Sequence, residues 1–343
     1  MAKIINGCFL SVIFFFSILF FIGGGADDMF EIEKRELREL PTLEEYTLNE
    51  LPEKYTEYIS DHFPLRRVIM KAASTGSYNI FGSIRSDAVV IGKNRFLFLN
   101  TMDNTSPKKD YQGTNLFSDS EIARLKETAA SLQAAAQTRG QKVLLMIVPN
   151  KEEVYSQYLP ESYNRLNEIT RRQQFCRRMQ DAGIDVLDIT EDLKSYTQTE
   201  NDIYFLADTH WTGKGAYIGM SAILDYMDID HIPYRENSFS SGNYYESDIA
   251  NLCNLYDEYA DTHDFNAEKD ICTEKSEMTV SFIGDSFRWR ITEYLNESFR
   301  QVNIFDHEFS QEELKKTQSD LLVIQVVERN LGNMQYLIPK ATY

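Results

Sequence analysis

The sequence predicts an α/β fold in which a mostly parallel sheet is covered by helices on both faces. Short, continuously apolar runs alternate with helical segments from about residue 118 towards the C-terminus. Strands that are apolar on both sides need helices on both faces of their sheet, which is typical of parallel sheets. In such folds the active site lies at the carboxyl ends of the strands. We therefore expect the functional residues where these apolar runs end.

The first helix and strand of this alternation have the clearest signals. Ser118 and Glu121 form a capping box, and apolar residues then recur at helical spacing until Gly140 ends the helix. The members of this apolar stripe are Ile122, Leu125, Ala129, Leu132 and Ala136. The run KVLLMIV at 142–148 follows as a buried strand.

The remaining elements continue the same alternation. A second helix ends at Gly183, and IDVLDI at 184–189 is the next strand. After a long irregular stretch, strands are predicted at 279–285 (TVSFIGD), 302–305 (VNIF) and 320–327 (DLLVIQVV). A helix follows the first of these three strands, and an acidic helix precedes the last.

Two regions precede the sheet. The β-rich run AVVIGKNRFLFL at 88–99 opens the main domain, which we place at 86–343. Residues 27–85 are charged and helical in character, and we interpret them as a stalk or arm.

The N-terminal segment, 1–26, predicts the compartment. Its stretch 8–22 is uncharged and apolar, with Lys3 before it and an acidic pair beginning at Asp27 after it. Positive charge before and negative charge after the apolar stretch predict a cytoplasmic N-terminus and an extracytoplasmic body. We expect an uncleaved single-pass membrane anchor, although the length also fits a secretory signal cleaved after the small residues that end at Ala26.

The net charge and the cysteines limit the classes of ligand that the chain can bind and the disulfides that it can form. The formal net charge of −18 argues against nucleic acid, because phosphates would be repelled along the whole surface. Cys176 falls on the apolar side of the second helix, where a buried thiol is expected. Cys253 and Cys272 are able to pair in an exported chain, but the sequence does not show whether they do. No residue spacing predicts a metal site, and no cofactor is expected.

The most informative strand end is GDSF. Ser286 follows the strand at 279–283, after Gly284 and Asp285, and opens a helix. Free N–H groups and the helix dipole favour developing negative charge at such a position, which suits a nucleophilic serine. For an isolated Asp-Ser pair, simple capping of the helix is the commoner role.

A matching base comes from the segment DTHW. Asp208 and His210 are two residues apart, so their side chains share one side of an extended segment, and a turn lets the carboxylate accept from the imidazole. The aspartate would then fix the tautomer of the ring, while the other ring nitrogen takes the serine proton. Thr212 is the expected cap of the following helix. The second copy of this tripeptide, at 261–263, stands in a charged stretch that we interpret as a solvated loop.

In this order, several motifs resemble the SGNH-hydrolase-like proteins of the DHHW family and the related alginate O-acetylation proteins. They are DHFPLRR at 61–67, VVIGKNRFLFL at 89–99, YQGTNL at 111–116, VPNKEEVYSQYLP at 148–160, DTHW at 208–211, GDSF at 284–287 and VVERNL at 326–331. The resemblance implies a flavodoxin-like three-layer domain and a Ser-His-Asp triad of Ser286, His210 and Asp208, with the Asp-His pair ahead of the serine. Thr209 stands where the DHHW signature has histidine, which bears on the subfamily and not on the triad.

Three further residues are candidates for substrate binding. Lys151 follows a strand end and would position a substrate or donate towards an oxyanion, unless it only caps a turn. Trp211 would stack on a sugar ring, unless it packs beside the catalytic loop. Arg329 follows the last strand, where it would contact substrate or pair with a buried carboxylate.

The expected function is that of an extracytoplasmic serine O-acetyltransferase that acts on a cell-surface or secreted polysaccharide through an acetyl-serine. The resemblance implies that a multi-spanning membrane O-acyltransferase supplies the acetyl group. Two alternatives stay open: an acetylesterase with the same triad, in which water replaces the sugar, and a non-catalytic glycan-binding or scaffold protein.

Overall fold

The computed structural model describes residues 37–341 apart from 64, 85, 103, 244–246 and 261–262, together with isolated positions between 5 and 18. The expected membrane anchor therefore lies mostly outside the described residues. Within the part that is described, no helix has the length and apolarity needed to cross a bilayer.

The chain divides into two compact units. The first comprises 1–85 and 250–258, and the second comprises 86–249 and 259–343. In the first unit, helices α3 (Leu51–Asp61) and α4 (Arg66–Phe81) form within the region expected to be helical. Within this unit Lys71 of α4 pairs with Asp257.

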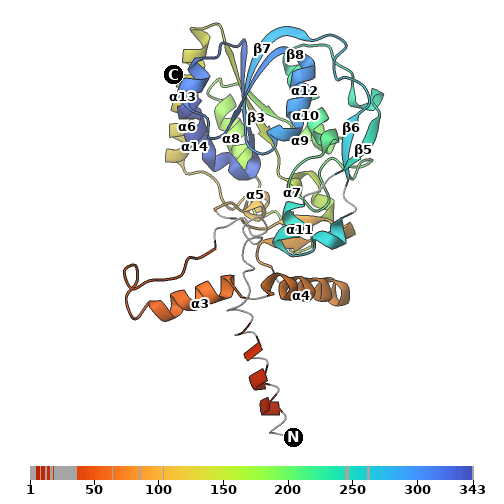
Figure 1. The fold of residues 1–343 in the computed structure, drawn as a ribbon. Helices are drawn as coiled ribbons and strands as arrows, with labels where there is room; N and C mark the ends of the chain where they lie inside the picture. Colours follow the sequence, from red (N-terminus) through yellow and green to blue (C-terminus); the bar gives the residue numbers. More distant parts are fainter. Residues whose placement is uncertain are drawn as a thin grey trace. The chain divides into compact units, whose positions relative to one another are not determined.

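A five-stranded parallel sheet forms the centre of the second unit (Figure 1). Its strands lie in the order β4 (Val186–Asp188), β3 (Lys142–Val148), β9 (Leu321–Val327), β7 (Ser276–Gly284) and β8 (Phe299–Asp306). Each neighbouring pair is parallel. The predicted strands are thus confirmed, and the last strand of the chain lies in the middle of the sheet.

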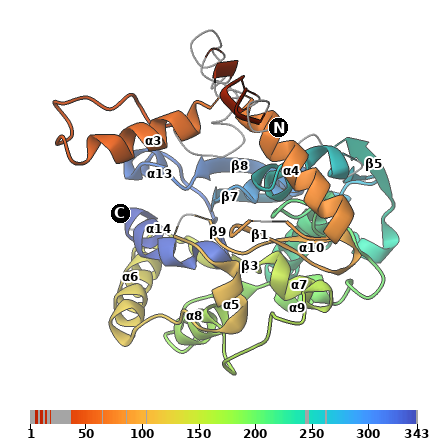
Figure 2. The same ribbon diagram turned by 90° about the horizontal axis from the view of Figure 1, so that it is seen from below.

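Helices cover both faces of the sheet, as Figures 1 and 2 show. The apolar residues of the strands divide between two core clusters, one for each helical layer. One layer consists of α6 (Asp119–Gln137), α8 (Arg171–Gln180), α13 (Gln311–Lys315) and α14 (Met334–Ala341). The other consists of α7 (Lys151–Val154), α9 (Thr190–Lys194), α10 (Gly213–Tyr226) and α12 (Arg288–Ser298). The three-layer α/β arrangement predicted from the sequence is therefore present.

Helix α6 forms as its sequence predicts. Both reciprocal bonds of the capping box between Ser118 and Glu121 are present, and the predicted stripe of five residues is buried. These residues pack against the face of β3 that carries Val143, Leu145 and Ile147. The side chain of Thr212 likewise caps α10 by accepting from the N–H of Lys214.

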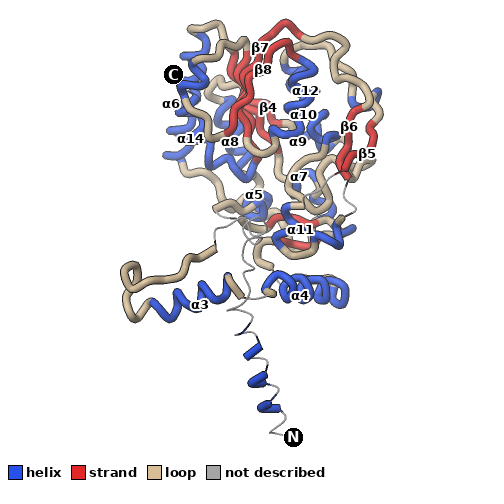
Figure 3. Tube along the Cα trace, in the orientation of Figure 1, coloured by secondary structure: helices blue, strands red, loops and turns tan. Residues whose placement is uncertain are grey.

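Smaller elements surround the sheet. Strands β1 (Val89–Ile91) and β2 (Leu97–Leu99) form a separate antiparallel hairpin, and α5 is Pro107–Gln112. Strands β5 (Phe239–Asn243) and β6 (His263–Ala267) form an antiparallel ribbon, coloured red beside α10 in Figure 3, and α11 is Asp248–Leu252. Short 3₁₀ turns occupy Lys93–Arg95, Ser156–Tyr158, Tyr234–Glu236, Tyr256–Tyr259 and Glu328–Asn333.

The structure also tests two local predictions, one for the repeated tripeptide and one for the cysteines. His263, the last residue of the repeated tripeptide, is exposed as predicted, but it begins β6 and does not lie in a loop; the two residues before it lie outside the described part. Cys176 is buried on α8 as predicted. Cys253 and Cys272 are free buried thiols, so no disulfide joins them.

Candidate active site

The polar motifs of the sequence meet at the carboxyl edge of the sheet. Strand β3 leads to Asn150, β9 leads to Glu328 and Arg329, and β7 leads to Asp285 and Ser286. Because all these strands are parallel, their carboxyl ends lie on the same edge. The expected location of the site thus follows from the topology.

Asp285 holds the turn between β7 and α12. Its carboxylate accepts from the N–H of Phe287 at 3.1 Å, from the side-chain amide of Gln325 at 2.9 Å and from the N–H of Val327 at 2.8 Å. The side chain of Asp285 therefore holds this turn and joins it to the adjacent strand β9. The hydroxyl of Ser286 remains available for another partner.

Asp208 and His210 lie in a loop whose two arms are joined. Tyr204 and Trp211 form an isolated antiparallel bridge, and the N–H of Phe205 donates to the carbonyl of His210 at 3.1 Å. These bonds close the loop that carries Asp208 and His210, and the chain continues from this loop directly into α10.

A chain of hydrogen bonds connects Ser286, His210 and Asp208. His210 Nε2 is 2.7 Å from Ser286 Oγ, and His210 Nδ1 is 2.7 Å from Asp208 Oδ1. The N–H of His210 also donates to Asp208 Oδ1 at 2.8 Å. With Nδ1–H donating to the carboxylate, the neutral ring presents Nε2 as the acceptor for the serine proton.

The environment of His210 favours its charged form. Burial lowers the pKa of His210, but the charge and hydrogen bond of Asp208 and the charge of Asp248 outweigh burial, so that the pKa lies above 6.5. A general base needs this property, because the imidazolium formed after proton transfer must be stabilised.

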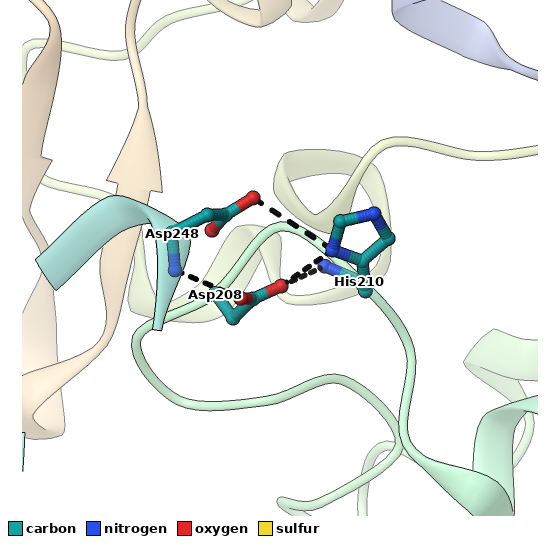
Figure 4. Close-up of side chains that lie close together, drawn as sticks. All are labelled: Asp208, His210 and Asp248. Carbon is teal, nitrogen blue, oxygen red and sulfur yellow. Dashed lines mark hydrogen bonds and ion pairs between the residues drawn. The ribbon is translucent and has the colours of Figure 1, made fainter. Parts of the chain in front are cut away.

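Asp248, the first residue of α11, is a member of the site that the sequence did not reveal (Figure 4). Its N–H donates to Asp208 Oδ2 at 2.8 Å, and its carboxylate lies 3.7 Å from His210 Nδ1. The same carboxylate accepts from the N–H of Thr209 at 2.7 Å and from the hydroxyl of Thr209 at 2.5 Å. Burial and the charge of Asp208 raise the pKa of Asp248 to about 6. No pattern near residue 248 distinguishes it from the other acidic residues of the chain.

Asp208, His210 and Asp248 also bring three possible metal-ligand atoms within 4.8 Å of one another. The nitrogen that faces both carboxylates is the one that donates to Asp208. A protonated nitrogen has no lone pair for a metal, so this arrangement suits proton transfer better than ion binding.

Lys151 is a buried positioning residue. Its ammonium group donates to three carbonyl oxygens, those of Leu97 at 2.7 Å, Leu206 at 2.9 Å and Asp208 at 3.0 Å. Burial lowers the pKa of Lys151 to about 8. With all three donors used and the side chain buried, the predicted contact with substrate is replaced by a role in fixing the loop that carries Asp208.

Trp211 and Arg329 are also buried. Trp211 has no exposed surface and donates through Nε1 to the carbonyl of Phe287 at 3.0 Å, so it packs beside the loop, as the second of the two alternatives predicted, and is not placed to stack on a sugar. Arg329 donates through Nη2 to the hydroxyl of Thr209 at 3.3 Å. Its guanidinium also lies 5.3 Å from the ring of Phe287. Both residues support the loop and the turn that carry the triad.

The motif residues around Asn150 form a buried layer beneath the site. Asn150 donates through its N–H to Glu328 at 3.1 Å and through its side chain to Asp110 at 3.0 Å, and it accepts from the N–H of Arg329 at 3.1 Å. This layer joins the ends of β3 and β9. It explains why two of the motifs that carry the family resemblance, those at 148–160 and 326–331, contain buried polar residues that are not members of the triad.

Ser286 borders two cavities. One of about 440 Å³ is lined by Phe205, His210, Trp211, Ser286, Phe287, Trp289, Arg290 and Glu293. The other, of about 370 Å³, is lined by residues that include Asp285, Ser286, His307, Asn330 and Tyr336. A third cavity of about 440 Å³, beside Asp225 and His231, contains no triad residue. The serine is thus accessible from two sides.

Comparison with known proteins agrees with this architecture. Residues 89–236 match the family described as ALGX, the SGNH hydrolase-like domain of acetyltransferase AlgX. A probable alginate O-acetylase AlgJ of Pseudomonas syringae pv. tomato is 24% identical over 162 residues, which are 47% of this chain and 38% of that protein. The chain therefore spans about two fifths of the length of the curated relatives that it matches.

Among the solved structures that are similar to this chain, one with a TM-score of 0.50 shares the fold at low sequence identity. A structure of Bacillus cereus PatB1 with a sulfonyl adduct is 14% identical and covers 73% of this chain and 99% of that chain, with a TM-score of 0.50. A DHHW family protein from Eubacterium siraeum is also 14% identical, covers 73% of this chain and 97% of that chain, and has a TM-score of 0.48. Within residues 89–236 the chain is therefore similar to the SGNH hydrolase-like domain of acetyltransferase AlgX, and its relatives include proteins named as probable alginate O-acetylases, as the motifs predicted.

Proposed function

We propose that this chain is a serine O-acetyltransferase that modifies hydroxyl groups of a polysaccharide. The observation that carries the proposal is the distance of 2.7 Å between His210 Nε2 and Ser286 Oγ, with Asp208 at the other ring nitrogen. The names of the relatives, which describe alginate O-acetylases, support a polysaccharide hydroxyl as the acceptor.

The first half of the reaction acetylates the serine. His210 takes the hydroxyl proton of Ser286 while Oγ forms a bond to the acetyl carbonyl of the donor. Negative charge then develops on the carbonyl oxygen. The bond to the donor group breaks, the donor leaves with the proton from His210, and acetyl-Ser286 remains.

The second half repeats these steps with a sugar hydroxyl in place of Ser286. The hydroxyl gives its proton to His210 and attacks the acetyl carbonyl, and the bond between this carbon and Ser286 Oγ then breaks. Oγ recovers the proton from His210. Water in place of the sugar gives acetate, which is the esterase reaction, so exclusion of water decides between the two activities.

The oxyanion donors differ from those expected at the helix N-terminus. The N–H groups of residues 287, 288 and 289 already donate to Asp285 Oδ1, to the Asp285 carbonyl and to the Ser286 carbonyl. We assign the oxyanion to the N–H of Ser286 and the side-chain amide of Asn330, which lines the cavity of about 370 Å³ beside Ser286. The Nδ2 of Asn330 donates one N–H to Asp285 Oδ2 at 3.4 Å and has a second N–H for the oxyanion.

The setting of the reaction completes the proposal. The apolar N-terminal stretch with its flanking charges supports an anchored protein whose second unit lies outside the cytoplasm. Acetyl-CoA is a cytoplasmic donor, so a multi-spanning membrane O-acyltransferase is the proposed supplier of the acetyl group.

Mass spectrometry of the purified chain tests the nucleophile. The chain is incubated with p-nitrophenyl acetate, and separately with phenylmethanesulfonyl fluoride, which labels activated serines whatever acyl donor they prefer. Both adducts are expected on the peptide that contains Ser286. Turnover of the ester is expected to fall by about 10³-fold or more in Ser286→Ala and His210→Ala.

A second histidine of the chain provides the matched control. His231 Nε2 lies 3.0 Å from Asp225 Oδ1, so it forms a His-Asp pair that does not include Ser286. His231→Ala should keep full turnover and both adducts. Folded protein that acquires neither adduct would show that Ser286 is not a nucleophile, and the scaffold function would then replace this proposal. Transfer to added oligosaccharides distinguishes the transferase from the esterase.

A further inference from the structure

The two tryptophans of the chain differ in the exposure of their side chains. Trp211 has no exposed surface, whereas Trp289 of α12 is 71% exposed. Trp289 lines the cavity of about 440 Å³ together with Ser286 and His210. Trp289 thus places a large, accessible aromatic ring on the cavity that contains the proposed nucleophile, where it can contact a bound ligand.

The side chain of Arg288 supports the Trp289 ring. The guanidinium of Arg288 lies over the ring, 5.4 Å from its centre. Arg288 itself donates to the carbonyl of Asp285 at 3.2 Å and pairs with Asp306. The cation supports one side of the indole and links it to the turn that carries Ser286. The high exposure of the ring leaves its other side accessible.

An accessible, supported indole suits the apolar face of a pyranose ring. The axial C–H groups of a sugar pack on aromatic faces, while its hydroxyl groups need polar partners around the rim. Arg290 and Glu293 supply such partners on the same cavity, and Phe205 adds apolar surface. A volume of about 440 Å³ also falls within the range of roughly 300–1,000 Å³ that is typical of small-molecule sites.

The charge at this cavity favours a neutral sugar over a uronate. Arg290, the cation that lines the cavity, already pairs with Asp264, and Glu293 adds a negative charge. The whole chain has a formal net charge of −18. A carboxylate on the acceptor would therefore meet more negative than positive charge.

We propose that Trp289 is the stacking platform for a neutral pyranose ring of the acceptor and holds one of its hydroxyl groups towards Ser286. This inference rests on the proposed transferase function, because it assigns the acceptor to the cavity at the nucleophile. It replaces the role in sugar binding that the sequence had suggested for Trp211.

Tryptophan emission tests the platform separately from the chemistry. Ser286→Ala protein, which cannot form an acyl-serine, is titrated with neutral tetrasaccharides of β-1,4-linked glucose, mannose and N-acetylglucosamine, and with a tetramer of mannuronate. Trp211 lines the same cavity but has no exposed surface, so protection from iodide quenching assigns an accompanying saturable change of emission to Trp289. At least one neutral tetramer is expected to give both signals and to bind more tightly than the mannuronate tetramer.

Calorimetric titration of variants completes the test. In the Ser286→Ala background, Trp289→Ala is expected to weaken binding of that tetramer at least tenfold, and Trp289→Phe should retain part of the affinity. Tyr226→Ala removes another exposed aromatic residue, one that lines neither cavity at Ser286, and should bind normally.

The outcomes separate the two proposals. Absence of binding by every neutral tetramer, tighter binding of mannuronate, or unchanged affinity in Trp289→Ala would overturn the platform, whatever happens at Ser286. Absence of both adducts on Ser286 in the unaltered chain would overturn the transferase, while binding to Trp289 would still be measurable.

Discussion

Asp208 divides its two carboxylate oxygens between different tasks. Oδ1 accepts from the ring and from the backbone of His210, and Oδ2 accepts from the N–H of Asp248. The carboxylate is thus fixed in orientation before any substrate arrives. Such preorganisation removes the cost of aligning the base during the reaction. The carboxylate of Asp248, 3.7 Å from the imidazole, adds a second negative charge.

Replacing Asp248 by asparagine tests this second charge. The raised pKa of His210 means that the neutral, basic form is lost as pH falls through a value above 6.5. Removing a neighbouring negative charge lowers that pKa, so the acidic limb of kcat/KM for ester hydrolysis should move to lower pH in Asp248→Asn. Profiles between about pH 5 and 9 measure the shift.

The control for this prediction is Asp225→Asn, which alters the carboxylate beside His231 instead. Its profile should match that of the unaltered chain. An acidic limb that stays in place or moves to higher pH in Asp248→Asn would show that Asp248 acts on His210 only by holding the loop.

At the scale of elements, the ribbon of β5 and β6 joins the two helices of the site. Asp264 of β6 accepts from the N–H of Gly213, the first residue of α10, at 2.9 Å, and it pairs with Arg290 of α12. The hydroxyl of Tyr294, also on α12, donates to the carbonyl of Gly213 at 3.1 Å. Helix α10 follows the loop of His210 and α12 follows Ser286, so these contacts fix the proposed base, His210, relative to the proposed nucleophile, Ser286.

Gly213 is the point at which this junction is tightest. A Cβ at this position would lie 1.7 Å from the carbonyl oxygen of Phe265, a backbone atom that cannot rotate away. Gly213→Ala should therefore destabilise the fold by about 1–3 kcal/mol, despite the better helix propensity of alanine. Denaturant unfolding followed by circular dichroism measures the change.

A second glycine serves as the control. At Gly332 the three nearest atoms to a new Cβ all belong to the flexible end of Arg171, so Gly332→Ala should cost much less than Gly213→Ala. Equal stability of the two variants would mean that α10 and β6 separate easily, and that the ribbon does not fix the site.

At the scale of the whole molecule, burial is distributed very unevenly. Strand β9 is buried at every residue and lies between β3 and β7 at the middle of the sheet. Helix α4 of the first unit has no buried residue. Backbone hydrogen bonds in a fully buried central strand open only with the fold, whereas those of an exposed helix open locally.

Hydrogen exchange is expected to follow this contrast. Amides of β9 should exchange at least about 100-fold more slowly than those of α4, which corresponds to roughly 3 kcal/mol in opening free energy. Exchange of the native chain followed by peptide mass spectrometry measures both regions in one sample, so that each serves as the reference for the other. Equal protection would show that the two units unfold as one.

The sequence by itself determined the features that depend on neighbours along the chain. The capping box at Ser118, the stripe of α6 and the apolar runs of the sheet are local patterns, and each forms where it was predicted. Ser286, His210 and Asp208 were also singled out from the sequence, by two short-range signals, a serine at a strand end and an aspartate two residues from a histidine, together with the family resemblance.

Only the tertiary structure decided which polar and aromatic residues face the site. Asp248 meets Asp208 across 40 positions of sequence, and Lys151 meets it across 57, so no local pattern reveals either contact. The exposure of the two tryptophans, Trp211 and Trp289, likewise depends on contacts that are distant in the sequence. Packing against the turn after β7 buries the first, and the outer side of α12 exposes the second. The chemistry of a side chain is written in the sequence, but its exposure and its partners depend on the long-range packing of the sheet and its helices.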